Sequence, residues 1–366
     1  MTGAKQQAAG SGRVGPISAV VCNFNGEKYL HGCLDALLAE GDELDEILVV
    51  DNGSTDNSLA TLASSYPNVK VLALGDNGGP CVARNAGLRE ARNRWVLAVD
   101  NDAVLRPGTT AKLRAALDAD PGAVLAQPRS VVAGEPGRIH YDGAEFHYVG
   151  LYALRNFFQP IAEAKGQGVV PVSGFVSICG LMDRETVLEL GGYDEQLFIL
   201  FEDFDLSLRL RIAGHRLLSV EDALVDHDAG TPGISFRQDA YPAKRAYFHS
   251  RNRWLLLAKC YSVRSLIVAL PGLMIYELVW LLFTLRSGHL GRHLHGKASF
   301  FRRLPQTLAL RRVVQRSRRC SDRDLLVPGP LTLSPQLVEK PLAAKLARGL
   351  DAVLSGWWRL AGRLAG

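Results

Sequence analysis

Short apolar runs alternate with amphipathic segments through the first hundred residues. The mostly apolar runs lie at 17–22, 47–50, 69–74 and 95–99, and the first three are each followed by a turn rich in Asn, Asp or Gly. After those turns, segments with helical spacing of apolar residues follow at about 29–38, 54–65 and 80–88. Continuous apolar runs are typical of strands that are covered on both faces. The pattern predicts an α/β domain with a mainly parallel sheet.

The pattern is less regular beyond residue 102. It predicts a helix over 107–117, strands over 123–126 and 173–180, a helix over 184–190, and a further helix from Glu202. The intervening segment 134–168 mixes aromatic residues with Gly and charge. A sugar or another flat substrate could stack there. A set of β-hairpins that pack their own aromatic residues fits that composition equally well.

Two groups of acidic residues are candidates for chemistry. Asp100 and Asp102 directly follow the apolar run 95–99. Ligands of open α/β sheets bind at the carboxyl ends of strands, so these acids could hold a divalent cation against a phosphorylated substrate. A surface turn is the alternative. Glu202 and Asp203 open a helix after an apolar run, where burial raises carboxylate basicity as a general base requires. Favourable interaction with the helix dipole is the structural alternative.

Common nucleotide motifs are absent from the sequence. No G-x-G-x-x-G follows the first apolar run, which argues against a nicotinamide enzyme. No G-x-x-x-x-G-K-[ST] occurs, which argues against a P-loop nucleotide hydrolase. The six cysteines show no C-x-x-C pair or regular spacing, a pattern that suits reduced cytosolic thiols rather than disulfides or zinc.

Charge is distributed unevenly along the chain. Residues 241–320 contain sixteen Lys or Arg and one acid, Glu277, so this part carries +15 and the remainder −10 of the net +5. Such a basic block indicates contact with an anionic surface. Nucleic acid would fit the charge alone, but the long apolar stretch inside the block favours lipid, and we expect no nucleic-acid partner.

That apolar stretch, residues 265–285, is long enough to cross a membrane. Both of its flanks are basic, however, and a single span would carry one of them across against the positive-inside tendency. An in-plane or re-entrant helix is therefore expected, and it also accommodates Glu277 more easily. Residues 342–364 carry an apolar stripe with Trp and a cationic face, which predicts a monotopic amphipathic helix. The alternative is a helix that packs on the catalytic domain or on another subunit.

These observations divide the chain into four parts. We expect a disordered tail at 1–16, a catalytic domain at 17–236, and a basic, apolar, helical membrane-associating region at 237–327. A linker rich in Pro and the amphipathic helix complete the chain at 328–366. The expected location is the cytoplasmic face of the cell membrane, peripheral or monotopic.

Five motifs in register resemble the family 2 inverting glycosyltransferases, in particular a bacterial rhamnosyltransferase-like branch. The resemblance covers about residues 17–230. The motifs are Cys22-Asn-Phe-Asn-Gly-Glu-Lys-Tyr-Leu, Val50-Asp-Asn-Gly-Ser-Thr-Asp-Asn-Ser, Asn77-Gly-Gly with Ala83-Arg-Asn-Ala-Gly, Asp100-Asn-Asp, and Gly191-Gly-Tyr-Asp-Glu with Glu202-Asp-Phe-Asp.

The resemblance implies a GT-A fold, a nucleotide-diphosphate sugar donor and transfer with inversion. Donor-binding residues would be Asn23, Asn25, Asp51, Asn77, Arg84 and Asp100, with Asp51 at the nucleobase. Asp102, together with Asp100 and His227, would hold Mg²⁺ or Mn²⁺. Asp203 would be the catalytic base, oriented by Glu202. For His227 a strand-ending structural role, and for Arg84 a place on a solvated helix face, remain alternatives.

A membrane-surface enzyme with a soluble donor would be expected to glycosylate a lipid-linked oligosaccharide or polysaccharide acceptor. A non-catalytic nucleotide-sugar or glycan-binding protein on the same scaffold is the alternative function. A sugar-phosphate nucleotidyltransferase would carry a Gly-rich, basic loop after the first strand, and residues 23–26 do not form one.

Overall fold

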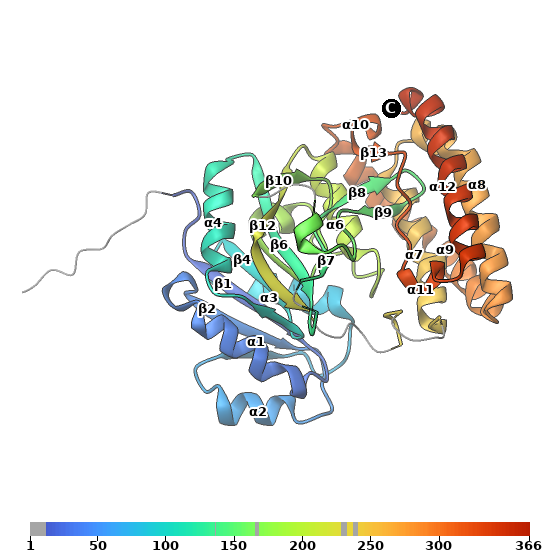
Figure 1. The fold of residues 1–366 in the computed structure, drawn as a ribbon. Helices are drawn as coiled ribbons and strands as arrows, with labels where there is room; N and C mark the ends of the chain where they lie inside the picture. The colour runs from blue at the N-terminus through green and yellow to red at the C-terminus, as the bar shows by residue number, and fades with distance from the viewer. Residues whose placement is uncertain (1–11, 136, 165–167, 228–232, 237–240) are drawn as a thin grey trace, which may run out of the picture.

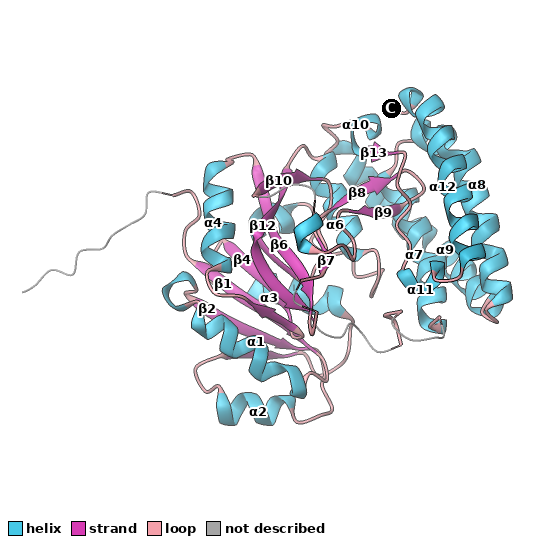
Figure 2. Ribbon diagram, in the orientation of Figure 1, coloured by secondary structure: helices cyan, strands magenta, loops and turns pink. Residues whose placement is uncertain are grey.

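A computed structural model describes residues 12–135, 137–164, 168–227, 233–236 and 241–366. A mixed sheet lies at its centre, with strands in the order β10-β12-β6-β11-β4-β1-β2-β3, β5 beside β12 and β7 beside β6 (Figure 2). The strands are β1 Ile17–Asn23, β2 Glu46–Asp51, β3 Lys70–Ala73, β4 Trp95–Asp100, β5 Ala103–Leu105, β6 Ala123–Val132, β7 Ile139–Tyr141, β10 Val169–Val172, β11 Cys179–Asp183 and β12 Arg216–His227. Strands β1 to β4 are parallel, as predicted, and β11 runs antiparallel between β4 and β6.

Helices cover both faces of this sheet. They are α1 Glu27–Ala39, α2 Ser58–Ser65, α3 Pro80–Glu90, α4 Thr109–Ala119, α5 Arg184–Glu189 and α6 Glu202–Ile212, with short turns η1 Gly41–Glu43 and η2 Ile161–Glu163. Side chains that alternate along the strands enter two different core clusters. Val49 and Leu97 pack with Leu34 of α1, whereas Leu48 packs with Leu88 of α3. Burial on both faces explains why these strands are continuously apolar in sequence.

Two predicted elements begin later than expected. The helix expected from residue 54 begins at Ser58, because the preceding residues form a turn in which Asp51 accepts the Ser54 N–H. The strand expected over 173–180 is instead β11, which begins at Cys179. Just before β11, side chains accept hydrogen bonds from the backbone N–H groups. The Phe175 N–H donates to Ser207 and the Val176 N–H to Gln127.

The segment 134–168, expected to be irregular, contains a hairpin. Strands β8 Ala144–His147 and β9 Leu151–Leu154 pair antiparallel, and β13 Leu326–Val327 joins β8 to make a second, three-stranded sheet. The hairpin alternative is therefore correct for part of this segment. Phe146 and Tyr152 stack on each other and on Phe204 of α6.

Part of the segment predicted to be a disordered tail is ordered. Residues 1–11 lie outside the described residues, but 12–16 pack on the domain. Val14 is buried, and the Arg13 guanidinium donates to the carbonyls of Leu117 and Ala123. These contacts satisfy a carbonyl in the last turn of α4 and one at the start of β6, which is a structural role that the Gly- and Ser-rich composition did not reveal.

The last third of the chain is helical, as predicted. Its helices are α7 Ala243–Cys260, α8 Val263–Arg286, α9 Leu290–Arg316, α10 Asp322–Leu325, α11 Pro335–Val338 and α12 Pro341–Ala361, followed by the turn η3 Gly362–Leu364. Figure 1 shows α8 and α12 at the end of the molecule opposite α1 and α2. A third core cluster joins this region to the domain, with Phe204 of α6, Leu256 of α7, Leu273 of α8 and Trp358 of α12 among its members.

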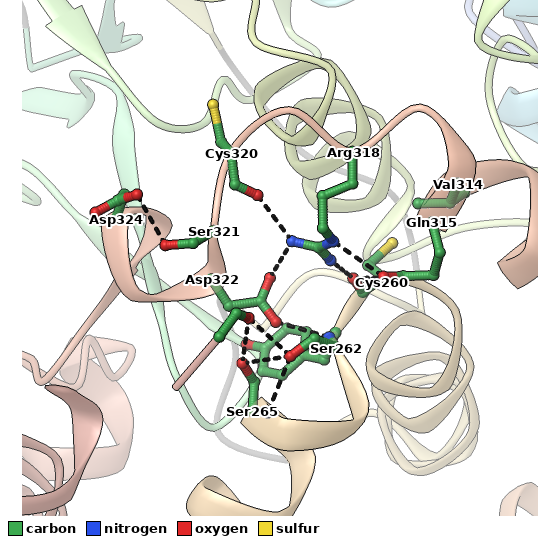
Figure 3. Close-up of polar contacts among 12 residues, drawn as sticks. Cys260, Ser262, Ser265, Val314, Gln315, Arg318, Cys320, Ser321, Asp322 and Asp324 are labelled. Carbon is green, nitrogen blue, oxygen red and sulfur yellow. Dashed lines mark hydrogen bonds and ion pairs between the residues drawn. The ribbon is translucent and has the colours of Figure 1, made fainter. Parts of the chain in front are cut away.

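One polar junction fixes the chain between α7, α8 and α9 (Figure 3). The Asp322 carboxylate accepts the Ser262 N–H at the start of α8 at 2.7 Å and an Arg318 N–H at 2.7 Å. The Arg318 guanidinium also donates to the carbonyls of Cys260 and Cys320. The Cys260 carbonyl at the end of α7 is thus satisfied by a partly buried cation.

Helix α8 is the one helix among the described residues that is long and apolar enough to cross a membrane. Its single acid, Glu277, points into the protein, where it pairs with the buried Arg253 and with Lys297. Another side of the helix is exposed and apolar, for example at Ile267 and Leu278. Helix α8 thus has one side that is ion-paired to its neighbours and one that is apolar and exposed.

Helix α12 has two apolar faces. Leu354 and Trp358 are buried against the domain, so the packing alternative is correct for this face. Members of the predicted stripe, such as Leu346 and Leu360, are each 65% exposed. The stripe therefore remains available for contact with something outside the described chain.

Candidate active site

The parallel strands bring three motif residues to one edge of the sheet. Asn23 ends β1, Asp51 ends β2 and Asp100 ends β4. The register pairs Asn23 with Asp51 and Cys22 with Asp100. The carboxyl ends of these strands thus meet at the position where open α/β sheets bind ligands.

The Asn residues of this edge hold its loops together. The Asn25 side chain accepts the Thr55 N–H at 2.7 Å, and Asn77 accepts the Gly79 N–H at 2.9 Å. Asn23 accepts from the Asn101 side chain at 2.7 Å. Asn101, which lies between the two acids, therefore links the loop after β1 to the loop after β4.

The expected nucleobase residue lies deeper than its neighbours. Asp51 is only 1% exposed, and its carboxylate accepts the Ser54 N–H at 3.0 Å. Asn23, Asn25 and Asn77 line the large cavity above the sheet, whereas Asp51 is not among its lining residues. Asp51 stabilises the turn after β2 at the side of this pocket. Its contact with a nucleobase stays a prediction.

Asp102 and His227 lie together although they are far apart in sequence. Strand β5 pairs antiparallel with β12 and places Ala103 opposite His227. As a result, the His227 Nε2 lies 3.4 Å from the Asp102 Oδ1. The His227 ring stacks on His140 at a centroid distance of 5.1 Å, and their Nδ1 atoms are 3.1 Å apart. His140 was missed in the sequence, because nothing in its local pattern distinguishes it from a strand residue.

This pair fits a divalent cation of the expected kind. Mg²⁺ is commonly held by one or two carboxylates and by the phosphates of its substrate, and carboxylates also suit Mn²⁺. No cluster of three or more His, Cys, Asp or Glu ligands occurs among the described residues. Asp102 and His227 would therefore supply part of the ligand set, with the remainder from a diphosphate and water.

Arg84 connects the two acidic groups. It lies on α3 with its side chain 7% exposed, so it is not on a solvated helix face. Its guanidinium is 2.8 Å from Asp100 and 3.1 Å from Glu202, and it donates to the Ser177 carbonyl. Burial raises the pKa of Asp100 even though Arg84 acts to lower it. Since its nitrogens already have protein partners, the arrangement favours a positioning role.

Asp203 has an environment suited to proton transfer. It lines the cavity in the first turn of α6, beside Glu202. Burial, and next the adjacent Glu202 carboxylate, raise the pKa of Asp203 to about 7. Glu202 uses one carboxylate oxygen to accept from Arg84, and its Oε2 is buried without a hydrogen-bond partner in the described part of the chain. By contrast Asp205, two residues on, is fully buried and paired with Arg209 and Lys259.

The loop before α6 is held in an unusual conformation. Phe198, Leu200 and Phe201 all have positive φ, at 63°, 67° and 71°, a region that costs energy for bulky residues. The side chain of Asn252, on α7, donates to the carbonyls of Leu197, Ile199 and Leu200. Asn252 is thus a site-supporting residue that sequence reasoning missed, because its partners are about fifty residues away.

The residues at this edge of the sheet surround one cavity of about 2310 Å³. It is lined by Asn23, Asn25, Asn77, Arg84, Asp100, Asp102, Glu202, Asp203 and His227. Aromatic residues of the 134–168 segment, Tyr141, Tyr152 and Phe157, contribute another wall. The structure therefore brings together every predicted site residue except Asp51 around a single space.

Comparison with known proteins agrees with this architecture. Residues 18–185 match the sequence model of the family described as glycosyl transferase family 2. The chain is 33% identical over 127 residues to the succinoglycan biosynthesis protein ExoO of Rhizobium meliloti (strain 1021), covering 34% of this chain but only 36% of that protein. It is 24% identical over 269 residues to the N-acetylglucosaminyl-diphospho-decaprenol L-rhamnosyltransferase of Mycobacterium tuberculosis (strain CDC 1551 / Oshkosh), covering 67% of this chain and 85% of that protein.

A solved structure supports the same fold. The crystal structure of GalNAc-T7 with UDP, GalNAc and Mn²⁺ superposes with a TM-score of 0.55 at 20% identity, covering 73% of this chain and 53% of that chain. The architecture is a GT-A glycosyltransferase fold with a mixed sheet and a helical C-terminal region. Residues 18–185 of the chain therefore form a glycosyl transferase family 2 domain.

Proposed function

We propose that this protein transfers a sugar from a nucleotide-diphosphate donor to an acceptor hydroxyl with inversion at the anomeric carbon. The observation that carries the proposal is the single cavity in which Asp203, with a pKa of about 7, faces the acids at the ends of the parallel strands. A single displacement needs a general base with a pKa near neutrality and groups that neutralise the charge on the leaving diphosphate.

In this proposal the donor lies over the ends of β1, β2 and β4. Asn23, Asn25 and Asn77 line its pocket, and Asp102 with His227 would hold Mg²⁺ or Mn²⁺ next to the diphosphate. A bound cation of this kind neutralises the charge that grows on the leaving diphosphate. Asp100, anchored by Arg84 at 2.8 Å, would orient the donor between cation and base.

Asp203 would remove the proton of the acceptor hydroxyl as that oxygen attacks the anomeric carbon. A single displacement inverts that carbon, because the attacking oxygen and the leaving diphosphate lie on opposite sides. Glu202 raises the basicity of Asp203 and is itself held by Arg84. Arg84 thereby links the position of the base to that of the donor acid.

The acceptor in this proposal is a lipid-linked oligosaccharide or polysaccharide precursor at the cytoplasmic face of the membrane. Support comes from the outward apolar stripe of α8, which includes Val263, Ile267, Leu270, Met274 and Leu278, all at least 50% exposed. Exposed apolar surface of this extent marks interaction with a membrane or partner. The mycobacterial relative is itself named as a rhamnosyltransferase of a diphospho-decaprenol-linked sugar.

A donor panel tests the proposal. The purified full-length protein is mixed with UDP-, dTDP- or GDP-sugars, with and without Mn²⁺, and thermal stability and donor hydrolysis are measured. The proposal expects one donor to stabilise the protein in a metal-dependent manner and to be slowly hydrolysed. Stabilisation by a donor with no turnover under any condition would instead indicate a non-catalytic nucleotide-sugar-binding protein.

A further inference from the structure

The cavity that contains Asp203 extends between α8 and α12. On this side its lining is apolar, with Val279 and Leu282 of α8 facing Leu342 and Leu346 of α12. These four side chains are between 41% and 69% exposed. We call this extension the α8–α12 groove.

The hydrogen bonds that the structure describes between the two helices lie at one end of the pair. The Trp357 indole N–H of α12 donates to the Val268 carbonyl of α8 at 2.9 Å, and the Ser262 hydroxyl donates to the Gly366 carbonyl at 2.8 Å. Both contacts join the first half of α8 to the last part of α12 and the residues that follow it. The groove lies between the opposite halves, around Leu282 and Leu342.

A continuous series of aromatic rings leads from the catalytic helix to this groove. Phe201, directly before Glu202, contacts His249 at a ring-centroid distance of 5.4 Å. His249 lies 4.1 Å from Trp280, which lies 5.3 Å from Phe283. All four rings line the cavity. The apolar groove and the acidic site are therefore one space rather than two neighbouring ones.

Cations lie along the same space. Lys244, Arg286 and Lys345 line the cavity and are exposed, and within the described residues none of them forms an ion pair with a carboxylate. Lys244 and Arg286 come from adjoining helix ends, because the Tyr241 ring contacts Phe283 at 5.0 Å. Lys and Arg in such positions bind phosphate groups through charge-assisted hydrogen bonds.

We propose that the α8–α12 groove binds the long hydrocarbon chain of an isoprenoid-type lipid diphosphate, with Lys244, Arg286 and Lys345 at its diphosphate. This proposal rests on the proposed function and specifies the acceptor of that site. A bilayer alone could cover the outward stripe of α8, but it could not enter a cavity that reaches Asp203 and the acids at the sheet edge. The shared space and the cations that line it suit one molecule that is apolar along its length and anionic at one end.

Direct binding of geranylgeranyl diphosphate to the full-length protein tests the groove without relying on turnover. Calorimetry compares this probe with inorganic diphosphate, which lacks the chain, and with geranylgeraniol, which lacks the charge. We expect geranylgeranyl diphosphate to bind at least about a hundredfold more tightly than inorganic diphosphate, since each buried CH₂ adds favourable free energy. Equal affinities for those two probes would overturn the proposal. Equal affinities for geranylgeranyl diphosphate and geranylgeraniol would also overturn it, by indicating a surface for ordinary membrane lipid.

Matched variants locate the binding site. Leu282 of α8 and Leu294 of α9 are both 55% exposed, but only Leu282 lines the cavity. Leu282→Asn should weaken geranylgeranyl diphosphate binding about tenfold and leave inorganic diphosphate unaffected, whereas Leu294→Asn should change neither. Arg286→Gln should weaken both diphosphates. Wild-type affinity of the Leu282→Asn protein for geranylgeranyl diphosphate would show that the chain lies elsewhere.

Lipid binding in the groove and sugar transfer at the acidic site can be measured separately. A protein that binds geranylgeranyl diphosphate through Leu282 but transfers sugar from no donor would retain the groove and reject the transferase. A protein that transfers sugar with the same KM to short-chain and long-chain acceptors would retain the transferase and reject the groove.

Discussion

Glu202→Gln should shift the pH dependence of sugar transfer toward lower pH. Burial and the Glu202 charge raise the pKa of Asp203 to about 7. A general base acts only when deprotonated, so kcat/KM of the wild type should rise with pH and level off above 7. With that pKa, roughly a tenth of Asp203 is deprotonated at pH 6 and about nine-tenths at pH 8, which predicts a roughly tenfold difference in rate. A carboxyl with the ordinary Asp pKa of about 3.9 would be almost fully deprotonated at both pH values, so the rates at pH 6 and pH 8 would be equal.

Removing the Glu202 charge removes one cause of the raised pKa and leaves the Arg84 cation less neutralised, and both changes lower the pKa of Asp203. The ratio of rates at pH 8 and pH 6 should therefore be smaller in Glu202→Gln than in the wild type, although burial, the larger cause, remains. Initial rates between pH 5.5 and 8.5, at subsaturating donor and fixed free Mn²⁺, measure it. A flat wild-type profile, or a variant whose rising limb moves to higher pH, would refute this reasoning.

Three further predictions follow from separate contacts. Arg84→Gln should lower the free energy of unfolding by about 3–5 kcal/mol, because it leaves a buried Glu202 unpaired, whereas Arg92→Gln at an exposed pair should cost under about 1 kcal/mol in urea titrations. Asp102→Asn should raise the Mn²⁺ concentration for half-maximal activity at least about tenfold, and an unchanged requirement would reject it as a ligand. Ile267→Asp combined with Leu278→Asp, at exposed positions outside the cavity, should abolish sedimentation with anionic vesicles, which the wild type should show at low salt.

Local patterns were sufficient for the regular part of the fold. The apolar strand 95–99 and the helix that begins at Pro80 are specified by burial on two faces and by a proline at the first helical position. The loop before β11 was misread as strand, because its backbone donors are satisfied by Ser207 and Gln127, which no local window contains.

The site shows the same division between local and long-range information. Asp100, Asp102 and Asp203 are recognisable from their neighbours in sequence and from the family resemblance. The contact of Asp102 with His227 depends on the β5–β12 pairing, and the capping of the 197–200 carbonyls by Asn252 depends on the packing of α7. Glu277 illustrates the limit most clearly. Composition places it within an apolar helix, but only the structure shows that Arg253 and Lys297 neutralise it.

Comparison of donor binding with donor turnover in the wild type and in Asp203→Asn tests the central claim most directly. Donor affinity is measured by calorimetry in the presence of Mn²⁺, and transfer to a lipid-linked acceptor is followed with the same protein preparations. The account predicts nearly equal donor affinity for the two proteins and a loss of transfer by several orders of magnitude in the variant. Near-normal transfer by the Asp203→Asn protein would contradict it.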